Sequence, residues 1–233
     1  FMSSVENNAP LRKKAVLPLL VLFIVAITLV SVIGWKYLPG YSSSPASLSE
    51  QLSANDAFIF PKAIEVSDVP FINEEGQLVG KNENLGKWSF LFFGYTFCPD
   101  VCPTTLSVMQ QMWIKLNPEM QSNTQVVLVS VDTERDTPEQ LKSYMDYFDP
   151  SFTAFTGKPD SLRSYAAELN AVYAKVERRN ALNEVDPELG YLMDHSANIT
   201  ILDPQGNYYG FIKPPFTPNK MLKIVTAIQY QTP

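Results

Sequence analysis

The chain contains very few residues that bind transition metals or react through sulfur. Its 233 residues include two cysteines, Cys98 and Cys102, and a single histidine, His195. Two cysteines and one histidine cannot complete the four-ligand cage of a structural zinc site by themselves. Any metal centre or thiol chemistry built from these residue types must therefore use the same three positions.

A surplus of positive charge is also missing. The sequence has 18 Lys and Arg residues against 24 Asp and Glu residues, which gives a net charge of -6. Recognition of phosphate backbones requires basic side chains concentrated on one face. This composition excludes a nucleic-acid-binding protein, and no repeat of 20 to 50 residues is visible that would indicate a solenoid or propeller.

One long stretch has no charged residue at all. Residues 15–35 are uncharged and mostly apolar, and a helix of this length spans about 30 Å, the thickness of the hydrocarbon core of a bilayer. The run predicts a transmembrane helix over residues 15–35. Because three basic residues at 12–14 precede it, the positive-inside rule places residues 1–14 in the cytoplasm or the mitochondrial matrix.

A cleaved signal peptide is the competing interpretation of this stretch. The apolar core of a signal peptide is usually about 7 to 15 residues long and ends at an A-x-A-like site, which is not evident here, so an uncleaved anchor is favoured. Residues 36–57 that follow are rich in Ser, Pro and Gly and predict a flexible tether. A folded domain is then expected over residues 58–229.

Strand and helix patterns alternate within this domain. Continuous apolar runs at residues 88–95 and 125–131 predict buried strands, and helical spacing follows each of them. Thr137 and Pro138 form a helix start, and Asp160 is a candidate cap for a helix over residues 161–170. The remaining predicted elements are strands at 152–155 and 172–177, a hairpin of 198–202 with 208–212, a final helix through residue 228, and N-terminal strands within 60–79.

This order predicts an α/β fold of the thioredoxin-like class. We expect a central mixed sheet flanked by helices, with an N-terminal β extension. Residues 178–193 show no clear period and predict an inserted loop, which His195 closes.

The two cysteines lie where the strand at 88–95 ends and the next helix begins. Cys98 and Cys102 are four positions apart, so on a helix their sulfurs would share one face. The free N–H groups and the dipole of a helix N-terminus favour anions and lower the pKa of a thiol. Pro99 and Pro103 stiffen the segment, so we expect two readily ionised thiols in a fixed geometry.

Two thiolates with one imidazole suit Cu(I), and three ligands leave a metal open to transfer. Zinc would require a fourth ligand, for which Asp100, Asp194 or a methionine are candidates. Met109, Met112 and Met193 are better explained as core residues, because Met at helical spacing usually fills gaps in packing.

Simpler interpretations exist for each of these residues. Outside the cytoplasm a cysteine pair often forms a structural or redox disulfide, and a lone histidine is usually a surface or core group. Asp132 and Asp136 have the spacing of turn and capping groups.

Three segments, taken in order, resemble the Sco/SenC family of copper chaperones. They are residues 93–106 (Phe-Gly-Tyr-Thr-Phe-Cys-Pro-Asp-Val-Cys-Pro-Thr-Thr-Leu), 130–139 (Ser-Val-Asp-Thr-Glu-Arg-Asp-Thr-Pro-Glu) and 194–197 (Asp-His-Ser-Ala). The resemblance covers roughly residues 58–229 and implies a membrane-anchored protein with a thioredoxin-like domain.

The resemblance also implies a site and a function. Cys98, Cys102 and His195 would bind one copper ion, as Cu(I) or Cu(II), to mature the dinuclear copper site of cytochrome c oxidase. The implied partners are the oxidase subunit that carries this site and a periplasmic copper donor. Four residues that match the family, Thr96, Pro99, Asp100 and Pro103, would shape the loop, and Asp194 would orient the imidazole.

The rival function is a thiol-disulfide oxidoreductase that reduces the copper-site cysteines of an oxidase subunit, or a related redox sensor, with no metal of its own. Thiol exchange needs Cys98 and Cys102 but not His195. The chain lacks the Cys-x-x-Cys motif of thioredoxins proper and their cis-proline just ahead of the strand that here starts near Ala197. A tethered interaction module with a structural disulfide is the third interpretation. The short, Arg-poor leader favours a bacterial inner membrane with the domain in the periplasm; the alternative is the mitochondrial inner membrane, facing the intermembrane space.

Overall fold

The computed structural model describes residues 13–37, 47–186, 188 and 190–231. Residues 1–12 of the leader predicted at 1–14 and residues 38–46 of the predicted tether lie outside these residues. Contacts within the chain define two compact units, with the boundary between Pro45 and Ala46, and each is described separately.

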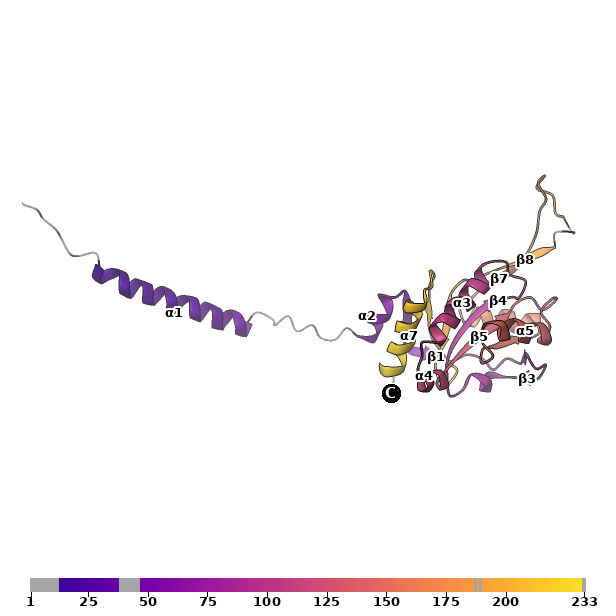
Figure 1. The fold of residues 1–233 in the computed structure, drawn as a ribbon, viewed down its shortest axis with the longest axis horizontal. Helices are drawn as coiled ribbons and strands as arrows, with labels where there is room; N and C mark the ends of the chain where they lie inside the picture. Colours follow the sequence, from indigo (N-terminus) through magenta and orange to yellow (C-terminus); the bar gives the residue numbers. More distant parts are fainter. Residues whose placement is uncertain (1–12, 38–46, 187, 189, 232–233) are drawn as a thin grey trace, which may run out of the picture. The chain divides into compact units, whose positions relative to one another are not determined.

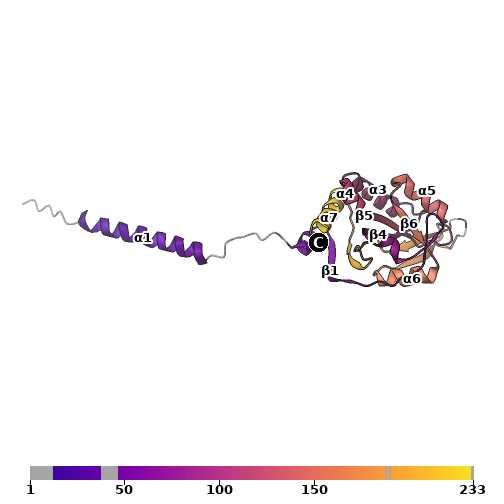
Figure 2. The same ribbon diagram turned by 90° about the horizontal axis from the view of Figure 1, so that it is seen from below.

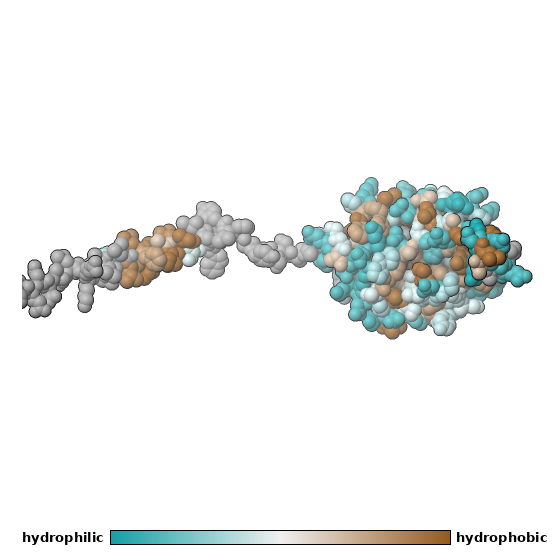
Figure 3. Space-filling view, turned by 90° about the horizontal axis from the view of Figure 1, so that it is seen from above, coloured by the Kyte–Doolittle hydropathy of each residue, from teal (hydrophilic) through white to brown (hydrophobic). Residues whose placement is uncertain are grey.

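The first unit contains one described helix, α1 (Lys13–Tyr37). Side chains are described for Pro18 and for residues 20–32, and these present a largely apolar surface (Figure 3). Within the described ranges, no helix meets the length and apolar character required to cross a bilayer. The transmembrane span expected over residues 15–35 therefore stays a prediction.

The second unit is built on a mixed eight-stranded sheet with the order β1-β10-β9-β4-β5-β6-β2-β3 (Figure 1). The central strands β4, β5 and β6 are parallel, and all other neighbours pair antiparallel. The strands are β1 (Ala57–Ile64), β2 (Phe71–Asn73), β3 (Leu78–Val79), β4 (Trp88–Gly94), β5 (Thr124–Ser130), β6 (Thr153–Thr156), β9 (Ile199–Leu202) and β10 (Tyr208–Ile212).

Helices cover both faces of this sheet, which confirms the predicted α/β architecture. Figure 2 shows α3 and α5 on one side of the central strands and α6 on the other. The helices are α2 (Leu48–Ser53), α3 (Val101–Trp113), α4 (Pro118–Ser122), α5 (Pro138–Phe148), α6 (Pro159–Glu168) and α7 (Pro218–Gln231), with a 3-10 turn at Lys81–Asn84.

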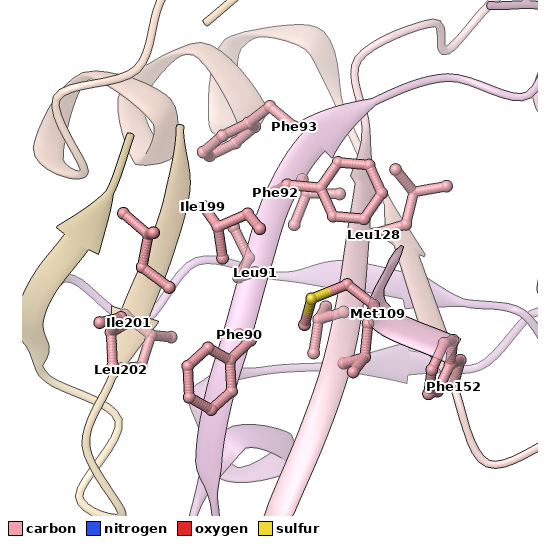
Figure 4. Close-up of a cluster of buried hydrophobic side chains, with 14 of the residues drawn as sticks. Phe90, Leu91, Phe92, Phe93, Met109, Leu128, Phe152, Ile199, Ile201 and Leu202 are labelled. Carbon is pink, nitrogen blue, oxygen red and sulfur yellow. The ribbon is translucent and has the colours of Figure 1, made fainter. Parts of the chain in front are cut away.

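The core fills the space between the helices and the central strands. Every residue of β4 and β5 is buried, as their uninterrupted apolar sequences predict. Figure 4 shows Met109 of α3 within this cluster, and Met109 and Met112 are both fully buried. Their interpretation as packing residues is confirmed.

The folded unit begins earlier than the predicted boundary at residue 58. Helix α2 lies inside the predicted tether and opens with a capping box, in which Glu50 N–H donates to Ser47 Oγ at 3.3 Å and Ser47 N–H donates to Glu50 at 2.8 Å. Leu52 of this helix is only 1% exposed and joins the core. The Ser-rich composition suggested disorder, but one capped turn with one buried leucine orders the segment from Ser47.

Two further boundaries differ from the expectations. Helix α6 starts at Pro159, its N-cap is Lys158, and no side chain caps it; Asp160 lies in the first turn instead of capping. The proline at the first helical position sets the start two residues earlier than the predicted one. The short helix α4 was not predicted, because its single turn is too brief to show a period.

A separate two-stranded sheet carries the histidine. Strands β7 (Tyr173–Glu177) and β8 (Tyr191–His195) pair antiparallel with each other, with Tyr173 opposite His195. Figure 1 shows both at the edge of the domain. The predicted loop at 178–193 is therefore too long, since its last three residues form the start of β8. Strand β7, which pairs with β8, is largely exposed.

Candidate metal centre

Cys98 lies on a tight turn between β4 and α3, and Cys102 lies in the first turn of α3. Cys98 N–H donates to the carbonyl of Tyr95 at 3.3 Å, which folds the chain back at the end of the strand. Cys102 is the second residue of α3 and is fully buried, whereas Cys98 is partly exposed. The backbone N–H of Cys102 points at Cys98 Sγ, 3.4 Å away, so the helix N-terminus faces the first sulfur as predicted.

Gly94, the last residue of β4, makes room for the second sulfur. A Cβ atom at this position would lie 2.8 Å from Cys102 Sγ and 3.0 Å from a methyl carbon of Leu128. Any larger residue would push Cys102 out of place or disturb the core. Reasoning from the sequence missed this residue, because only the fold shows that the sulfur turns back onto the strand.

His195 turns its Nε2 atom toward the cysteines. Nε2 lies 3.5 Å from Cys102 Sγ, and the Nδ1 atom lies 3.1 Å from the backbone carbonyl of Ser196. Because a carbonyl only accepts hydrogen bonds, Nδ1 carries the proton and Nε2 presents a lone pair. The predicted role of Asp194 in orienting the imidazole is wrong: the carbonyl next to the histidine occupies Nδ1, and Asp194 is exposed.

The ring of His195 is also held by packing. It contacts Tyr95 edge-on, with ring centroids 6.1 Å apart and an interplanar angle of 87°. Tyr95 is 2% exposed and belongs to the turn that carries Cys98. One buried aromatic residue thus connects the histidine strand with the cysteine turn.

The structure brings the three predicted ligands together. The ligand atoms of Cys98, Cys102 and His195 all lie within 4.8 Å of one another, although the histidine is 93 positions from Cys102 in the sequence. No other His, Cys, Asp or Glu in the described residues belongs to this group. Asp100 and Asp194, the carboxylate candidates for a fourth ligand, are therefore not part of the cluster, and its donors are two sulfurs and one imidazole nitrogen.

The two thiols differ in charge state. The hydrogen bond from Cys102 holds the pKa of Cys98 well below its usual value, with further help from His195 and from backbone N–H groups. The same bond, together with burial, raises the pKa of Cys102. The expectation of two equally willing thiolates is therefore corrected to one thiolate, Cys98, with Cys102 as its proton-bearing partner.

The pKa of His195 results from opposing effects. Burial lowers it, but the hydrogen bond and charge of the Cys98 thiolate and the carbonyl of Ser196 outweigh burial, so the pKa is raised. An imidazole beside a thiolate is poised to hold a proton or a cation between the two groups.

Asp136 holds the turn between β4 and α3 through hydrogen bonds. Its carboxylate accepts hydrogen bonds from the backbone N–H of Thr96 at 3.0 Å, from the Thr96 hydroxyl at 2.6 Å and from the hydroxyl of Ser130. Burial raises its pKa, although these bonds act in the opposite direction. The prediction of a capping role for Asp136 is wrong, since Thr137 caps α5; the loop-shaping role implied for Thr96 agrees with these bonds.

The site opens into a shallow, mainly apolar hollow of about 370 Å³. Cys98 and His195 line it together with Val176 and Leu192 from the histidine hairpin. Both of these apolar side chains are exposed. The cluster is therefore reachable from one side while Cys102 remains covered.

The sequence also matches a family of known proteins. The SCO1/SenC family model matches residues 61–229. The chain belongs to the SCO1/SenC family. Its resemblance to the Sco/SenC proteins, drawn from three motifs, is thereby confirmed.

Individual relatives match most of this chain. The second unit of the chain, described from residue 47 onward, is called the Sco domain below. The SCO2-like protein of Rickettsia felis is 30% identical over 79% of this chain and 85% of its own length. The copper-bound ScoI of Arabidopsis thaliana superposes with a TM-score of 0.61 at 27% identity, covering 71% of this chain and 98% of that one. The copper-bound ScoI of Bradyrhizobium japonicum gives a TM-score of 0.60 at 28% identity, covering 70% and 98%.

These neighbours confirm the thioredoxin-like fold class predicted for the Sco domain. Relatives also include mitochondrial proteins, such as the SCO1 homolog 1 of Arabidopsis thaliana, 32% identical over 60% of this chain and 40% of its own length. Copper is present in solved structures of the family, and its donor preferences fit the two sulfurs and one imidazole clustered here.

Proposed function

We propose that this Sco protein carries one copper ion on Cys98, Cys102 and His195 and delivers it to the dinuclear copper site of cytochrome c oxidase. The observation that carries the proposal is the convergence of the three ligand atoms within 4.8 Å. Family membership supports it: BsSco, a structural neighbour, is a member of the Sco family of cytochrome c oxidase assembly proteins.

The residues have distinct tasks in this proposal. The Cys98 thiolate is the first ligand that copper meets, because it is charged and accessible. Cys102 must release its proton as it binds, and His195 offers a lone pair without losing a proton, since Nδ1 holds the proton. Three donors leave a position on the ion for a ligand of the accepting subunit, and a copper donor in the same compartment would load the site.

The test is copper retention by the reduced chain against a competing chelator, with thiolate-to-copper absorption as a second readout. We expect one tightly held ion in the wild type and weakened or lost binding in Cys98→Ala, Cys102→Ala and His195→Ala. Asp146→Ala, which removes an exposed carboxylate on α5 away from the site, is the control and should bind as the wild type. Binding that is indifferent to His195 contradicts the proposal.

A second function, thiol-disulfide exchange, is favoured by the asymmetry of the two thiols. Cys98 would attack a disulfide of the oxidase subunit and form a mixed disulfide. Cys102 would then lose its proton, attack Cys98 and release the partner's second thiolate, leaving an oxidised Cys98–Cys102 pair that a dithiol reductant must restore. A disulfide switch has been identified in BsSco. Exchange that persists in His195→Ala, with no copper retained by the wild type, would select this function.

We also infer that residues 15–35 anchor the protein in a membrane, with residues 1–14 on the cytoplasmic or matrix side and the Sco domain on the other. The uncharged run and the three basic residues before it support this arrangement. The bacterial inner membrane is preferred, with the mitochondrial inner membrane as the alternative. Resistance to alkaline extraction and protease access to the Sco domain from the outer side are the expected results; release of the chain by alkali would contradict the anchor.

A further inference from the structure

Arg135 contacts both segments that supply the candidate ligands. It lies in the connection between β5 and α5, outside the cluster itself. Its guanidinium carbon is 4.8 Å from the ring centroid of Phe97, the residue before Cys98, and 3.7 Å from the ring centroid of Tyr191, the first residue of β8. Cationic guanidinium groups bind favourably over aromatic rings at such distances.

Directional bonds fix the guanidinium in this place. Its Nε donates to the Asp132 carboxylate at 2.6 Å, and another of its nitrogens lies 2.5 Å from the same oxygen. Its third nitrogen donates to the backbone carbonyl of Tyr191 at 3.2 Å. Nε and Nη1 make these two hydrogen bonds at once, while Nη2 meets the Asp132 carboxylate as an ion pair without a hydrogen bond of its own. The single ammonium group of lysine cannot occupy all three positions.

Asp132 closes the arrangement from the other side. Its carboxylate is 2% exposed, and its second oxygen accepts a hydrogen bond from the Tyr191 hydroxyl at 2.7 Å. Arg135 thus contacts the ring and the carbonyl of Tyr191, and Asp132 accepts a hydrogen bond from its hydroxyl. The turn and capping role predicted for Asp132 describes its backbone, whose carbonyl accepts from Asp136 N–H at 2.9 Å, but not its side chain.

Other charges near this contact are exposed. Lys175 of β7 lies 4.0 Å from the centroid of the same Tyr191 ring and pairs with Glu134 at 2.8 Å. Both of these side chains face solvent, with exposed fractions of 39% and 63%. An exposed ion pair of this kind contributes little to structure, so the grip on β8 rests on Arg135 and Asp132.

We propose that Arg135 is a positioning residue that holds the β8 strand, and with it His195, against the cysteine turn. The clamp, defined as Arg135, Asp132 and Tyr191, lies at one end of a five-residue strand whose other end is His195. Among the residues that the structure describes, the β7–β8 sheet shares no strand pairing with the main sheet, so these side-chain contacts take the place of a backbone ladder. The proposal rests on the proposed copper function, since His195 matters there as a ligand.

The test combines Arg135→Lys, Tyr191→Phe and His195→Ala with the control Lys175→Gln. Loss of a contact that orients a metal ligand typically costs about 10- to 100-fold in affinity, and we expect this loss of copper affinity in Arg135→Lys, a smaller one in Tyr191→Phe, and none in the control. In a His195→Ala background Arg135→Lys should add no further loss, because a positioning residue acts through the residue it positions.

A readout without metal makes the outcome independent of copper binding. Hydrogen exchange at residues 191–195 of the metal-free chain should be faster in Arg135→Lys than in the wild type, while exchange in β4 and β5 should be unchanged. Wild-type exchange in this variant, or an equal copper loss in the presence and absence of His195, overturns the clamp. A wild type that retains no copper refutes the proposed function alone, and the exchange result still decides the clamp.

Discussion

The two halves of the candidate metal centre are built in different ways. The cysteine turn is continuous with β4, the central strand of the main sheet, and Cys102 is fully buried beneath it. The histidine comes from the β7–β8 hairpin, a separate sheet in which only Met193 is buried. The difference indicates that the sulfurs are set by the folding of the whole domain, whereas the imidazole depends on a local attachment that can loosen without unfolding the core.

Hydrogen exchange gives the largest expected contrast between the two halves. In the metal-free protein, amides of residues 173–177 and 191–195 should exchange at least ~100-fold faster than those of β4 and β5, because exposed, peripheral elements open at lower free energy. Copper should slow exchange in the hairpin and leave the β9–β10 hairpin, which belongs to the main sheet, unchanged. Equal protection of the β7–β8 hairpin with and without copper would contradict a mobile third ligand.

Alkylation tests the contrast within the cysteine pair. A lowered pKa keeps Cys98 ionised at pH values at which an ordinary thiol is protonated. The rate at which iodoacetamide alkylates Cys98 should therefore change little between about pH 8 and pH 6. An ordinary thiol, with a pKa near ~8.5, loses roughly tenfold per pH unit over this range. Cys102, buried and with a raised pKa, should react far more slowly throughout.

Peptide mass spectrometry after short pulses measures both rates in one sample. In denaturant the two cysteines should become alike, which serves as the control. A tenfold fall per pH unit for Cys98 in the folded protein would show that its thiolate is not stabilised.

Gly94→Ala should displace Cys102 and leave the β7–β8 hairpin, which carries His195, intact. The added methyl group would meet Cys102 Sγ at 2.8 Å, and overpacking of this kind lowers the free energy of unfolding by about 1–3 kcal/mol. Copper affinity should fall as Cys102 shifts, while exchange at β8 stays as in the wild type.

Gly76→Ala is the matched control for that substitution. Gly76 has a positive φ of 76° and nothing within 4 Å of its Cβ position, so alanine there strains only the backbone of a distant turn. It should lower stability without changing copper binding. Identical copper affinity in Gly94→Ala and the wild type would show that the sulfur tolerates displacement.

Asp136→Asn gives the smallest expected effect on copper affinity. An amide keeps one oxygen acceptor where the carboxylate has two, so a group on the half-buried Thr96 or the buried Ser130 loses its partner at a cost of about 1–3 kcal/mol. Chemical denaturation should show this loss, together with weaker copper binding. Asp146→Asn, at the exposed pair with Lys142, is the control and should change stability by no more than about 1 kcal/mol.

Much of this protein is encoded in local patterns. The apolar runs of β4 and β5, the Thr-Pro start of α5 and the two cysteines at a helix entry predicted the sheet, the helices and half of the site. Such signals work because burial on both faces and a capped helix start depend on neighbouring residues. The ligand set including His195 came from three motifs in order, since spacing alone could not connect residues 93 positions apart.

The features that were missed depend on long-range packing. Gly94 matters only because Cys102 folds back over it, and Asp132, Arg135 and Tyr191 act together only because β8 lies against the β5–α5 connection. Strand β8 itself was concealed because the apolar Leu192 lies on its exposed face, so Tyr191, Leu192 and Met193 form an apolar run without the alternation of a half-buried strand. The prediction assigned the orientation of the His195 ring to Asp194, whereas the Ser196 carbonyl contacts Nδ1. A sequence shows which side chains are present but not the direction of backbone groups.

The burial of Cys102 makes the two sulfurs unequal as entry points. An incoming thiol or an acceptor's ligand can approach from the open hollow and reach Cys98, but helix α3 and strand β4 cover the sulfur behind it. Under either proposed function, an intermediate shared with a partner, whether a bridged ion or a mixed disulfide, would therefore form first at Cys98. Solvent access would then set the order in which bonds form and break at the site, and a partner would need to recognise only one face of the Sco domain.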